Sequence, residues 1–497
     1  MSRVLYENID DESFILSVQN IPNILAPYSW KAKIEKCSEY AIKAFDGAFT
    51  CNVKNCSVLP MPWELNTFMA IATIYKDGPI DEIPDPIFKL IINSIRTASP
   101  KRLYEEDCDI KDYIACVIAS IQMPYQQNQL ILLLRYRFFY SYVNEKENIN
   151  IARLFYSKFG VDGDDIFLFV LLLHMASNQR KTWTRFLSDF CSSYRMQPNE
   201  TFFQILNLFS IERLDFSSKQ KCLFDFSNDG YVNANNLLEE YPFIRMKGRY
   251  YLPLPYLVGI AAARHLFDRL MPLKGVARSK MGGLLMEAYV YNLFCYSECY
   301  DSIEREFKYR LNGRVMLSPD VIIRKSNVWL FVEVKLAEAP IDLRQMIPGK
   351  ISILRKASAK RVFQLYSRIK EICKGSAKKK LHPKLDDVYG VVVVHEDTYI
   401  LRDDIYEECF KAHPELEESE REFIKKRISI TGVYTIEVFC YSHSDIFKGL
   451  RKRELDSPYQ ISLSLHMGDF CNGKIHIPLE EFKALAEKLP SRLFREA

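Results

Sequence analysis

The stretch SPDVIIRKSNVWLFVEVKL, residues 318–336, holds two runs of apolar and β-branched residues on either side of the tetrapeptide KSNV. Apolar runs that flank a short polar break predict a β-hairpin. If Ser326 and Asn327 form the turn, Lys325 pairs with Val328, and the pairing continues along both strands. The stretch therefore predicts an antiparallel pair of strands within a sheet.

The same pairing places Asp320 opposite Glu333. Opposed residues of an antiparallel pair have Cβ atoms about 5 Å apart on one face, and Lys335 shares that face because strand side chains alternate with a period of two. Two carboxylates in an apolar hairpin repel each other and lose hydration, which a divalent cation would relieve. Oxygen ligands suit Mg²⁺, with Mn²⁺ as an alternative. We expect the ligands to be Asp320, Glu333 and the carbonyl group of Val334.

Pro319-Asp320, twelve intervening residues and Glu333-Val334-Lys335 together resemble the signature of the PD-(D/E)XK nuclease superfamily. The resemblance covers about residues 280–400 and implies a restriction-endonuclease-like α/β domain with a mixed central sheet. It implies metal-dependent cleavage of DNA by Asp320, Glu333 and Lys335, as in restriction and prokaryotic anti-phage nucleases. Lys335 would position the attacking water and stabilise the charge on phosphorus.

Two other functions stay open beside a DNA endonuclease. A catalytically silent protein with a nuclease-like fold would bind nucleic acid without cleaving it, although the intact Asp320, Glu333 and Lys335 argue against this. RNA could replace DNA as the substrate, but the chain has no RNP1 motif or GXXG loop to favour it.

Glu287 is a fourth candidate, because the family usually carries an acidic residue on the helix that precedes the sheet. It lies in GGLLMEAYVYNLF, residues 282–294, at helical spacings from the apolar Leu284, Tyr291 and Phe294. The resemblance makes Glu287 a catalytic residue that binds a second metal ion or its water. The structural alternative is a glutamate at the edge of the apolar stripe that extends its carboxylate to solvent or pairs with a lysine.

Positive charge is concentrated just after the hairpin. Residues 344–384 contain 13 lysines and arginines against one acid, whereas the whole chain has a formal net charge of only +4. Such a concentration is expected for a polyanionic substrate, and its alternative is a solvated helix face with a basic loop. We expect Arg361, Gln364 and Arg368 to share a face opposite the apolar one. The nucleic-acid contacts are predicted to be Arg355, Lys356, Lys360, Arg361, Gln364 and Arg368.

The first 275 residues predict an all-α domain, because apolar residues recur at helical spacing through much of this half. This domain would recognise the substrate, a trigger or a partner protein, or join copies of the chain. The helices are expected at residues 62–75, 86–98, 112–123, 129–143, 184–194 and 199–209.

The second half alternates helices and strands, which predicts a nuclease core at residues 276–400 and an α+β extension at residues 401–497 that can complete the sheet. Residues 477–494 predict a terminal amphipathic helix. The strands are expected at residues 302–309, 318–325, 327–336, 388–395, 428–442 and 459–467.

The remaining features exclude other classes. The longest apolar run, residues 166–173, is far shorter than the roughly 20 residues that span a bilayer, so it predicts a buried helix and no membrane partner. No secretory signal is visible, and a cytoplasmic location is expected. Thirteen scattered cysteines indicate reduced thiols. Residues 225–236 resemble a calcium-binding EF-hand loop until Asn236, where a glutamate is needed, so a polar turn is expected.

Overall fold

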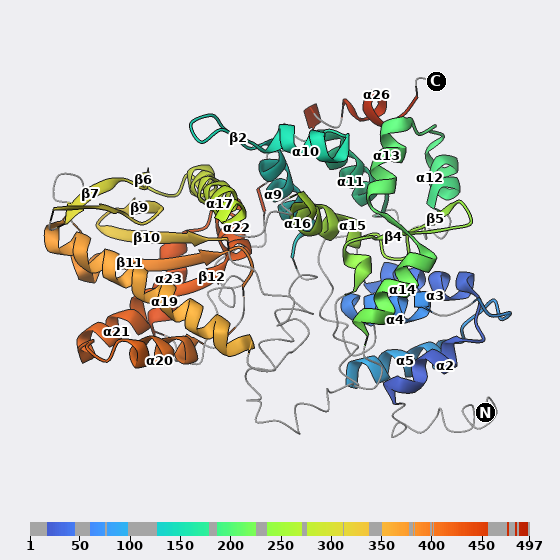
Figure 1. Ribbon diagram of the computed structural model, residues 1–497, viewed down its shortest axis with the longest axis horizontal. Coiled ribbons are helices and arrows are strands. Elements are labelled where there is room, and N and C mark those ends of the chain that lie inside the picture. The colour runs from blue at the N-terminus through green and yellow to red at the C-terminus, as the bar shows by residue number, and fades with distance from the viewer. Residues whose placement is uncertain are drawn as a thin grey trace. The chain divides into compact units, whose positions relative to one another are not determined.

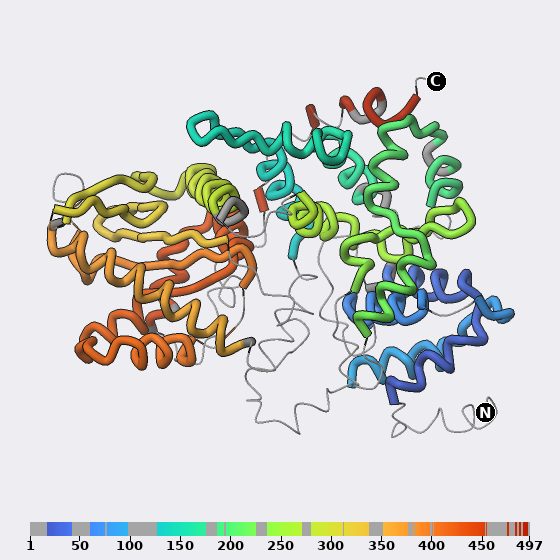
Figure 2. Tube along the Cα trace, viewed as in Figure 1, coloured from blue at the N-terminus to red at the C-terminus, as the bar shows by residue number. Residues whose placement is uncertain are grey.

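The computed structural model describes most of the chain as two compact units (Figures 1 and 2). The first unit holds the described residues up to 270 and those from 483 onward, and the second holds those from 276 to 476. In sequence the change falls between residues 272 and 273, close to the predicted boundary at 275. The described residues are 17–44, 60–74, 77–97, 127–177, 186–224, 236–270, 276–311, 313–336, 350–376, 381, 383–397, 400, 402–455, 475–476, 483–484 and 487–495.

Helices make up most of the first unit, as the apolar periodicity predicts. Five of the six expected helices are present, as α4, α5, α9, α12 and α13, while the one expected at 112–123 lies outside the described residues. The helices are η1 (Val18–Asn20), α2 (Ile21–Leu25), α3 (Trp30–Ala44), α4 (Pro62–Ile74), α5 (Asp85–Thr97), α9 (Gln129–Ser141), α10 (Ile151–Phe159), α11 (Gly163–Ser177), α12 (Phe186–Tyr194), α13 (Glu200–Leu208), α14 (Arg213–Leu223), η5 (Leu237–Glu239), α15 (Leu257–Ile260), η6 (Ala261–His265), α16 (Leu266–Leu270) and α26 (Leu489–Leu493).

The apolar run at 166–173 forms the centre of α11 and is buried throughout, as predicted. A helix that is apolar on all sides fits only the core of a domain. Nearly all of the EF-hand-like segment lies outside the described residues, apart from Asn236, whose side chain caps η5 by accepting a hydrogen bond from the amide of Leu238 at 3.0 Å.

The first unit is mainly helical, but it also contains strands that the sequence did not predict. It contains a three-stranded sheet of β3 (Ser210–Glu212), β4 (Phe243–Met246) and β5 (Arg249–Tyr251), and a short β1–β2 hairpin (Val143–Asn144 and Ile149–Asn150). Lys247 and Gly248, between β4 and β5, both have positive φ angles. That conformation favours a tight two-residue hairpin turn. Strands of three or four residues are too short to reveal a period in the sequence.

The second unit is an α/β unit built on a mixed five-stranded sheet in the order β12-β11-β10-β9-β6 (Figure 1). Strands β10, β11 and β12 are parallel, whereas β9 is antiparallel to both β10 and β6. Its elements are α17 (Val276–Ser297), β6 (Ser302–Arg305), β7 (Lys308–Leu311), β8 (Arg314–Leu317), β9 (Val321–Lys325), β10 (Val328–Lys335), α19 (Lys350–Glu371), η7 (Ile372–Ser376), η8 (Leu385–Asp387), β11 (Val388–Val394), α20 (Arg402–Ala412), α21 (Glu418–Arg427), β12 (Ile428–Gly432), α22 (Val433–Tyr441) and α23 (Ile446–Leu455).

The predicted hairpin and its register are confirmed. Lys325 pairs with Val328, and the ladder of β9 and β10 continues to the pair Val321 and Val332. Ser326 adopts a positive φ of 54° in the turn, and its amide donates a 2.6 Å hydrogen bond to Asp301. The register follows from the two apolar runs, because a shift by one residue would turn every apolar side chain to the wrong face.

Helices cover both faces of this sheet. On one face, Val362, Leu365 and Ile369 of α19 belong to a buried cluster with Phe331 of β10 and Val392 of β11. Helix α17 contacts β10, β6 and α22. The hydroxyl group of Tyr289 in α17 donates a 2.6 Å hydrogen bond to the buried Glu437 of α22.

The prediction of one strand over residues 428–442 was wrong beyond Gly432. The chain forms β12 up to that residue, and α22 begins at Val433. Both elements are almost entirely buried, and a continuous apolar run does not distinguish a buried strand from a buried helix. The strand expected at 302–309 is likewise interrupted between β6 and β7.

The residues from 401 onward are divided between the two units, and β12 agrees with the expectation that they can complete the sheet. Strand β12 completes the sheet of the second unit, whereas residues near the C-terminus belong to the first unit. There the side-chain amide of Asn199 donates a 2.8 Å hydrogen bond to the carbonyl group of Arg492, and Phe494 packs against Phe190 and Phe202. The strand expected at 459–467 lies outside the described residues, and so do residues 477–482 and 485–486 of the predicted terminal helix, whose described part contains α26.

Candidate active site

Three carboxylates occupy one row across three neighbouring strands of the second unit. The backbone ladders end at the pairs Val321–Val332 and Arg305–Val321. One residue further on, Asp320 is level with Glu333 on one side and with Glu306 on the other. The amide of Glu306 donates a 2.9 Å hydrogen bond to the carbonyl group of Asp320, which continues the pairing on that side.

Asp320 is held by the strand that carries the other half of the motif. Its side chain is 8% exposed, and its Oδ2 accepts a 2.6 Å hydrogen bond from the amide of Val334. Burial raises the pKa of Asp320 to about 7, and the charge of Glu333 adds to this shift while Lys335 opposes it. Asp320 therefore lies in a region of excess negative charge.

Glu333 contacts two cationic side chains. It is 1% exposed, and its Oε1 lies 2.6 Å from Nζ of Lys335, while its Oε2 accepts a hydrogen bond from the guanidinium group of Arg368. Lys335 follows on the same strand, and Arg368 comes from α19 above the same face. These two cationic side chains balance part of the negative charge for which the sequence analysis expected a metal ion alone.

Glu287 adds a fourth carboxylate from α17. Burial raises its pKa to about 8, with further contributions first from Asp320 and then from Glu306. Its carboxyl group is therefore close enough to feel the row on the sheet. No ion pair joins Glu287 to a lysine within the described residues, so the alternative of a lysine-paired edge glutamate is not observed. Helix α17 approaches β10 closely at Gly282, where a Cβ atom would lie 2.1 Å from Leu336.

Glu306 was missed by the sequence reasoning. Partial desolvation raises its pKa, Arg368 opposes that shift, and Glu333 adds to it. The residue pairing that placed Asp320 opposite Glu333 could have been extended to the strand before it. Residues 302–309 look like one continuous strand in the sequence, however, so the end of β6 just before Glu306 could not be recognised.

The predicted nucleic-acid contacts differ in burial. Arg368 and the half-buried Arg361 lie toward the sheet, whereas Gln364 is exposed with Lys356 and Lys360. Arg355 instead forms a 3.7 Å ion pair with Asp404 of α20. Arg361, Gln364 and Arg368 lie three and four residues apart and so share a side of α19. That side borders the apolar stripe and does not oppose it, because Arg361 and Arg368 are half-buried and Arg368 reaches Glu333. Residues 344–349, 377–380 and 382 of the basic segment lie outside the described residues.

The donor atoms at the row suit a hard cation. In the described part of the chain, no group of three or more histidine, cysteine, aspartate or glutamate side chains could hold a metal ion as it stands. Mg²⁺ does not require such a cage, since one or two carboxylates, waters and a substrate phosphate are enough. Asp320 and Glu333 meet this need, and the raised pKa values of Asp320 and Glu287 mark negative charge that a cation would balance. The amide of Val334 donates a hydrogen bond to Asp320. The role of the Val334 carbonyl group as a metal ligand stays a prediction.

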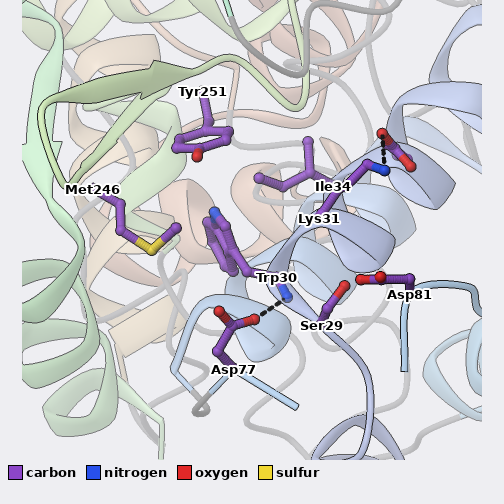
Figure 3. A pocket seen from close by; sticks show the side chains of 9 residues that line it. Ser29, Trp30, Lys31, Ile34, Asp77, Asp81, Met246 and Tyr251 are labelled. Atoms are coloured by element: carbon purple, nitrogen blue, oxygen red, sulfur yellow. Dashed lines mark hydrogen bonds and ion pairs between the residues drawn. The ribbon is translucent and has the colours of Figure 1, made fainter. Parts of the chain in front are cut away.

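A separate pocket of about 200 Å³ lies in the first unit, at the start of α3 (Figure 3). Trp30 and Tyr251 meet edge to face in it, with ring centres 6.3 Å apart. Its charged lining residues are Glu35, Asp77 and Asp81 against Lys31 alone. Three carboxylates facing one ammonium group disfavour a phosphate, so this pocket does not suit the polyanion that the sequence predicts.

In a comparison with known proteins, no protein-family model, no curated protein and no solved structure matches the chain. Among the described residues, none of the helices has the length and apolarity needed to cross a membrane. The function must therefore be argued from the site itself.

Proposed function

We propose that this protein is a metal-dependent nuclease that hydrolyses DNA phosphodiester bonds, of the kind used in restriction and anti-phage defence. The observation that carries the proposal is the convergence of Asp320, Glu333 and Lys335 on one face of a single hairpin, with the 2.6 Å contact between Lys335 and Glu333. The approach of Glu287 from α17 supports it, since all four candidate catalytic residues then share one site.

The order of elements in the second unit supports the same proposal. Helix α17 is followed by the antiparallel strands β6, β9 and β10, then by α19 and the parallel strand β11. A restriction-endonuclease-like core is expected to place an acidic helix before the sheet, and a helix and a further strand after the motif. Residues 276–394 follow that plan.

In the proposed reaction, water attacks phosphorus in line with the bond to the 3′ oxygen, which breaks to leave a 5′-phosphate and a 3′-hydroxyl group. Asp320 and Glu333 would hold Mg²⁺ or Mn²⁺, which when bound makes water a better nucleophile and polarises the phosphate. Lys335, with 35% of its side chain exposed, can donate hydrogen bonds to the water and to a phosphate oxygen. The first unit would then recognise the substrate, a trigger or a partner.

One observation favours a second candidate, a nucleic-acid-binding protein that does not cleave. Both oxygens of Glu333 contact cationic side chains, an arrangement that satisfies this carboxylate without a metal ion. The two candidates differ in whether a divalent cation binds at the row, which is a measurable property.

The test is to incubate the purified protein with supercoiled plasmid, linear DNA and RNA, each with Mg²⁺, Mn²⁺ or EDTA. We expect DNA cleavage that EDTA abolishes and that Asp320→Asn lowers by at least about a hundredfold. Asp386→Asn removes the same charge from an exposed position and should leave the rate unchanged. Cleavage that survives Asp320→Asn would refute the site, and binding without cleavage would favour the silent protein. Cleavage of RNA alone would show that the substrate is RNA and not DNA.

A further inference from the structure

Arg368 occupies an unusual position for a residue expected to bind nucleic acid. Its guanidinium group donates to Oε2 of Glu333, and this is the ion pair that the structure shows for it. Its side chain remains 28% exposed, while that of Glu333 is 1% exposed. Arg368 therefore lies at the rim of the site, with its guanidinium group on a buried carboxylate and its side chain still partly exposed.

The two oxygens of Glu333 are shared between Arg368 and Lys335. Lys335 contacts Oε1, so the oxygen that Arg368 contacts is the remaining one. Asp320, level with Glu333 on the neighbouring strand, contacts the amide of Val334 but forms no ion pair with Arg368 or Lys335. Any cation that bridges Asp320 and Glu333 must compete with the side chains already on Glu333, and Arg368 is the one that comes from outside the strand.

A guanidinium group is also well suited to a phosphate. It has five N–H donors in a planar fork that matches the oxygens of a carboxylate or a phosphate, and it remains charged at any physiological pH. Arg368 can contact Glu333 or a phosphodiester, and it cannot bind both with the same edge of its fork.

We propose that Arg368 competes with the divalent cation for Glu333 and is released from it when a phosphodiester binds. This inference rests on the proposed function. In the free protein Arg368 neutralises Glu333 and weakens metal binding. When a phosphate takes the guanidinium group, Glu333 becomes available to the metal, so nucleic acid and metal bind with positive coupling. Because coupling between two ligands is reciprocal, the metal also strengthens the binding of nucleic acid.

The experiment measures Mn²⁺ binding by electron paramagnetic resonance, with and without a short DNA duplex whose phosphorothioate linkages resist cleavage. In the wild-type protein the duplex should tighten Mn²⁺ binding. Arg368→Gln should bind Mn²⁺ about fivefold more tightly than wild type when no duplex is present, and the duplex should add little. Arg310→Gln makes the same substitution at an exposed position of β7 and should behave as wild type.

Arg368→Lys keeps the charge without the planar fork, and its Mn²⁺ affinity without duplex should fall between those of wild type and Arg368→Gln. It serves as the deciding variant if thermal unfolding shows that Arg368→Gln is not folded. Unchanged or weaker Mn²⁺ binding by a folded Arg368 variant overturns the competition, while Mn²⁺ binding by the wild type still supports the proposed function. If the wild type binds no Mn²⁺ with or without the duplex, both proposals fail.

Discussion

The amide of Val334 donates a 2.6 Å hydrogen bond to Oδ2 of Asp320, which lies one residue before β9 begins. This bond connects the two halves of the motif directly, because Val334 lies between Glu333 and Lys335. The orientation of the Asp320 carboxylate is thus fixed by the backbone of β10, and its second oxygen is left for another ligand. The spacing of the motif in the sequence and the pairing of β9 with β10 therefore place the same two carboxylates beside each other.

Lys335 should matter for cleavage and not for holding the cation. Lys335→Ala removes the donor that the proposed function assigns to the reacting phosphate, so we expect the cleavage rate to fall by about a hundredfold or more. Its positive charge opposes metal binding at Glu333, 2.6 Å away, so Mn²⁺ affinity should stay the same or increase. Gel assays of plasmid cleavage beside Mn²⁺ titrations test both expectations.

Lys411→Ala is the control for Lys335→Ala, since it removes an exposed lysine from α20. It should cleave as wild type does. A Lys335→Ala protein that cleaves normally, or that loses Mn²⁺ binding, would contradict the role assigned to this ammonium group.

The stability of the metal-free protein should decrease as pH rises. The folded-state pKa values of about 7 for Asp320 and about 8 for Glu287 lie above their usual values. The folded state therefore binds more protons than the unfolded state between about pH 4 and pH 8, and the free energy of unfolding falls across that window and levels off above it. Urea unfolding in EDTA at several pH values measures this slope.

Neutral variants should remove part of that pH dependence. At pH 8 without metal, Asp320→Asn is expected to be more stable than wild type by about 2 kcal/mol, because a buried like charge is removed. Saturating Mg²⁺ should reduce the difference by stabilising the wild type alone. A wild-type protein whose metal-free stability rises steadily from pH 5 to pH 8 would exclude the proposed charge excess.

The core of this site could be predicted from the sequence because its parts are close along the chain. Asp320 and Glu333 lie on consecutive strands joined by a two-residue turn, and the apolar runs leave only one register. Arg368 could not be placed in the same way. Its contact depends on how α19 rotates on the sheet, which Leu365 and Ile369 decide by packing against β10 and β11.

The errors in the fold have a similar origin. Residues 433–441 are apolar enough to be a buried strand, but in the structure they form the helix α22, which packs against α17. Strand β3 of the first unit pairs with β4, some thirty residues further along the chain. Local patterns reveal which side chains are buried, but they do not specify long-range partners.

Glu306 should contribute to cation binding although it lies outside the motif. It is level with Asp320, and its carboxylate adds negative charge to the row. Glu306→Gln should therefore weaken Mn²⁺ binding by about threefold, as expected for the loss of one nearby charge at high effective dielectric. Glu304→Gln is the matched control, because it changes the same strand two residues earlier, opposite Ile322. Equal effects of the two substitutions in Mn²⁺ titrations would show that only overall charge matters.

Gly390 should control the position of α19, and through it that of Arg368. A Cβ atom on Gly390 would lie 3.0 Å from both Leu365 and Ile369 of α19 and 3.3 Å from Ile428 of β12. Gly390→Ala should cost little, whereas Gly390→Val should lower the free energy of unfolding by about 2 kcal/mol, because overpacking pushes the helix away from the sheet. Arg368 then loses its contact with Glu333, so Mn²⁺ binding without DNA should tighten in Gly390→Val as in Arg368→Gln. A destabilised Gly390→Val protein whose Mn²⁺ affinity equals that of wild type would show that α19 can move without releasing Glu333.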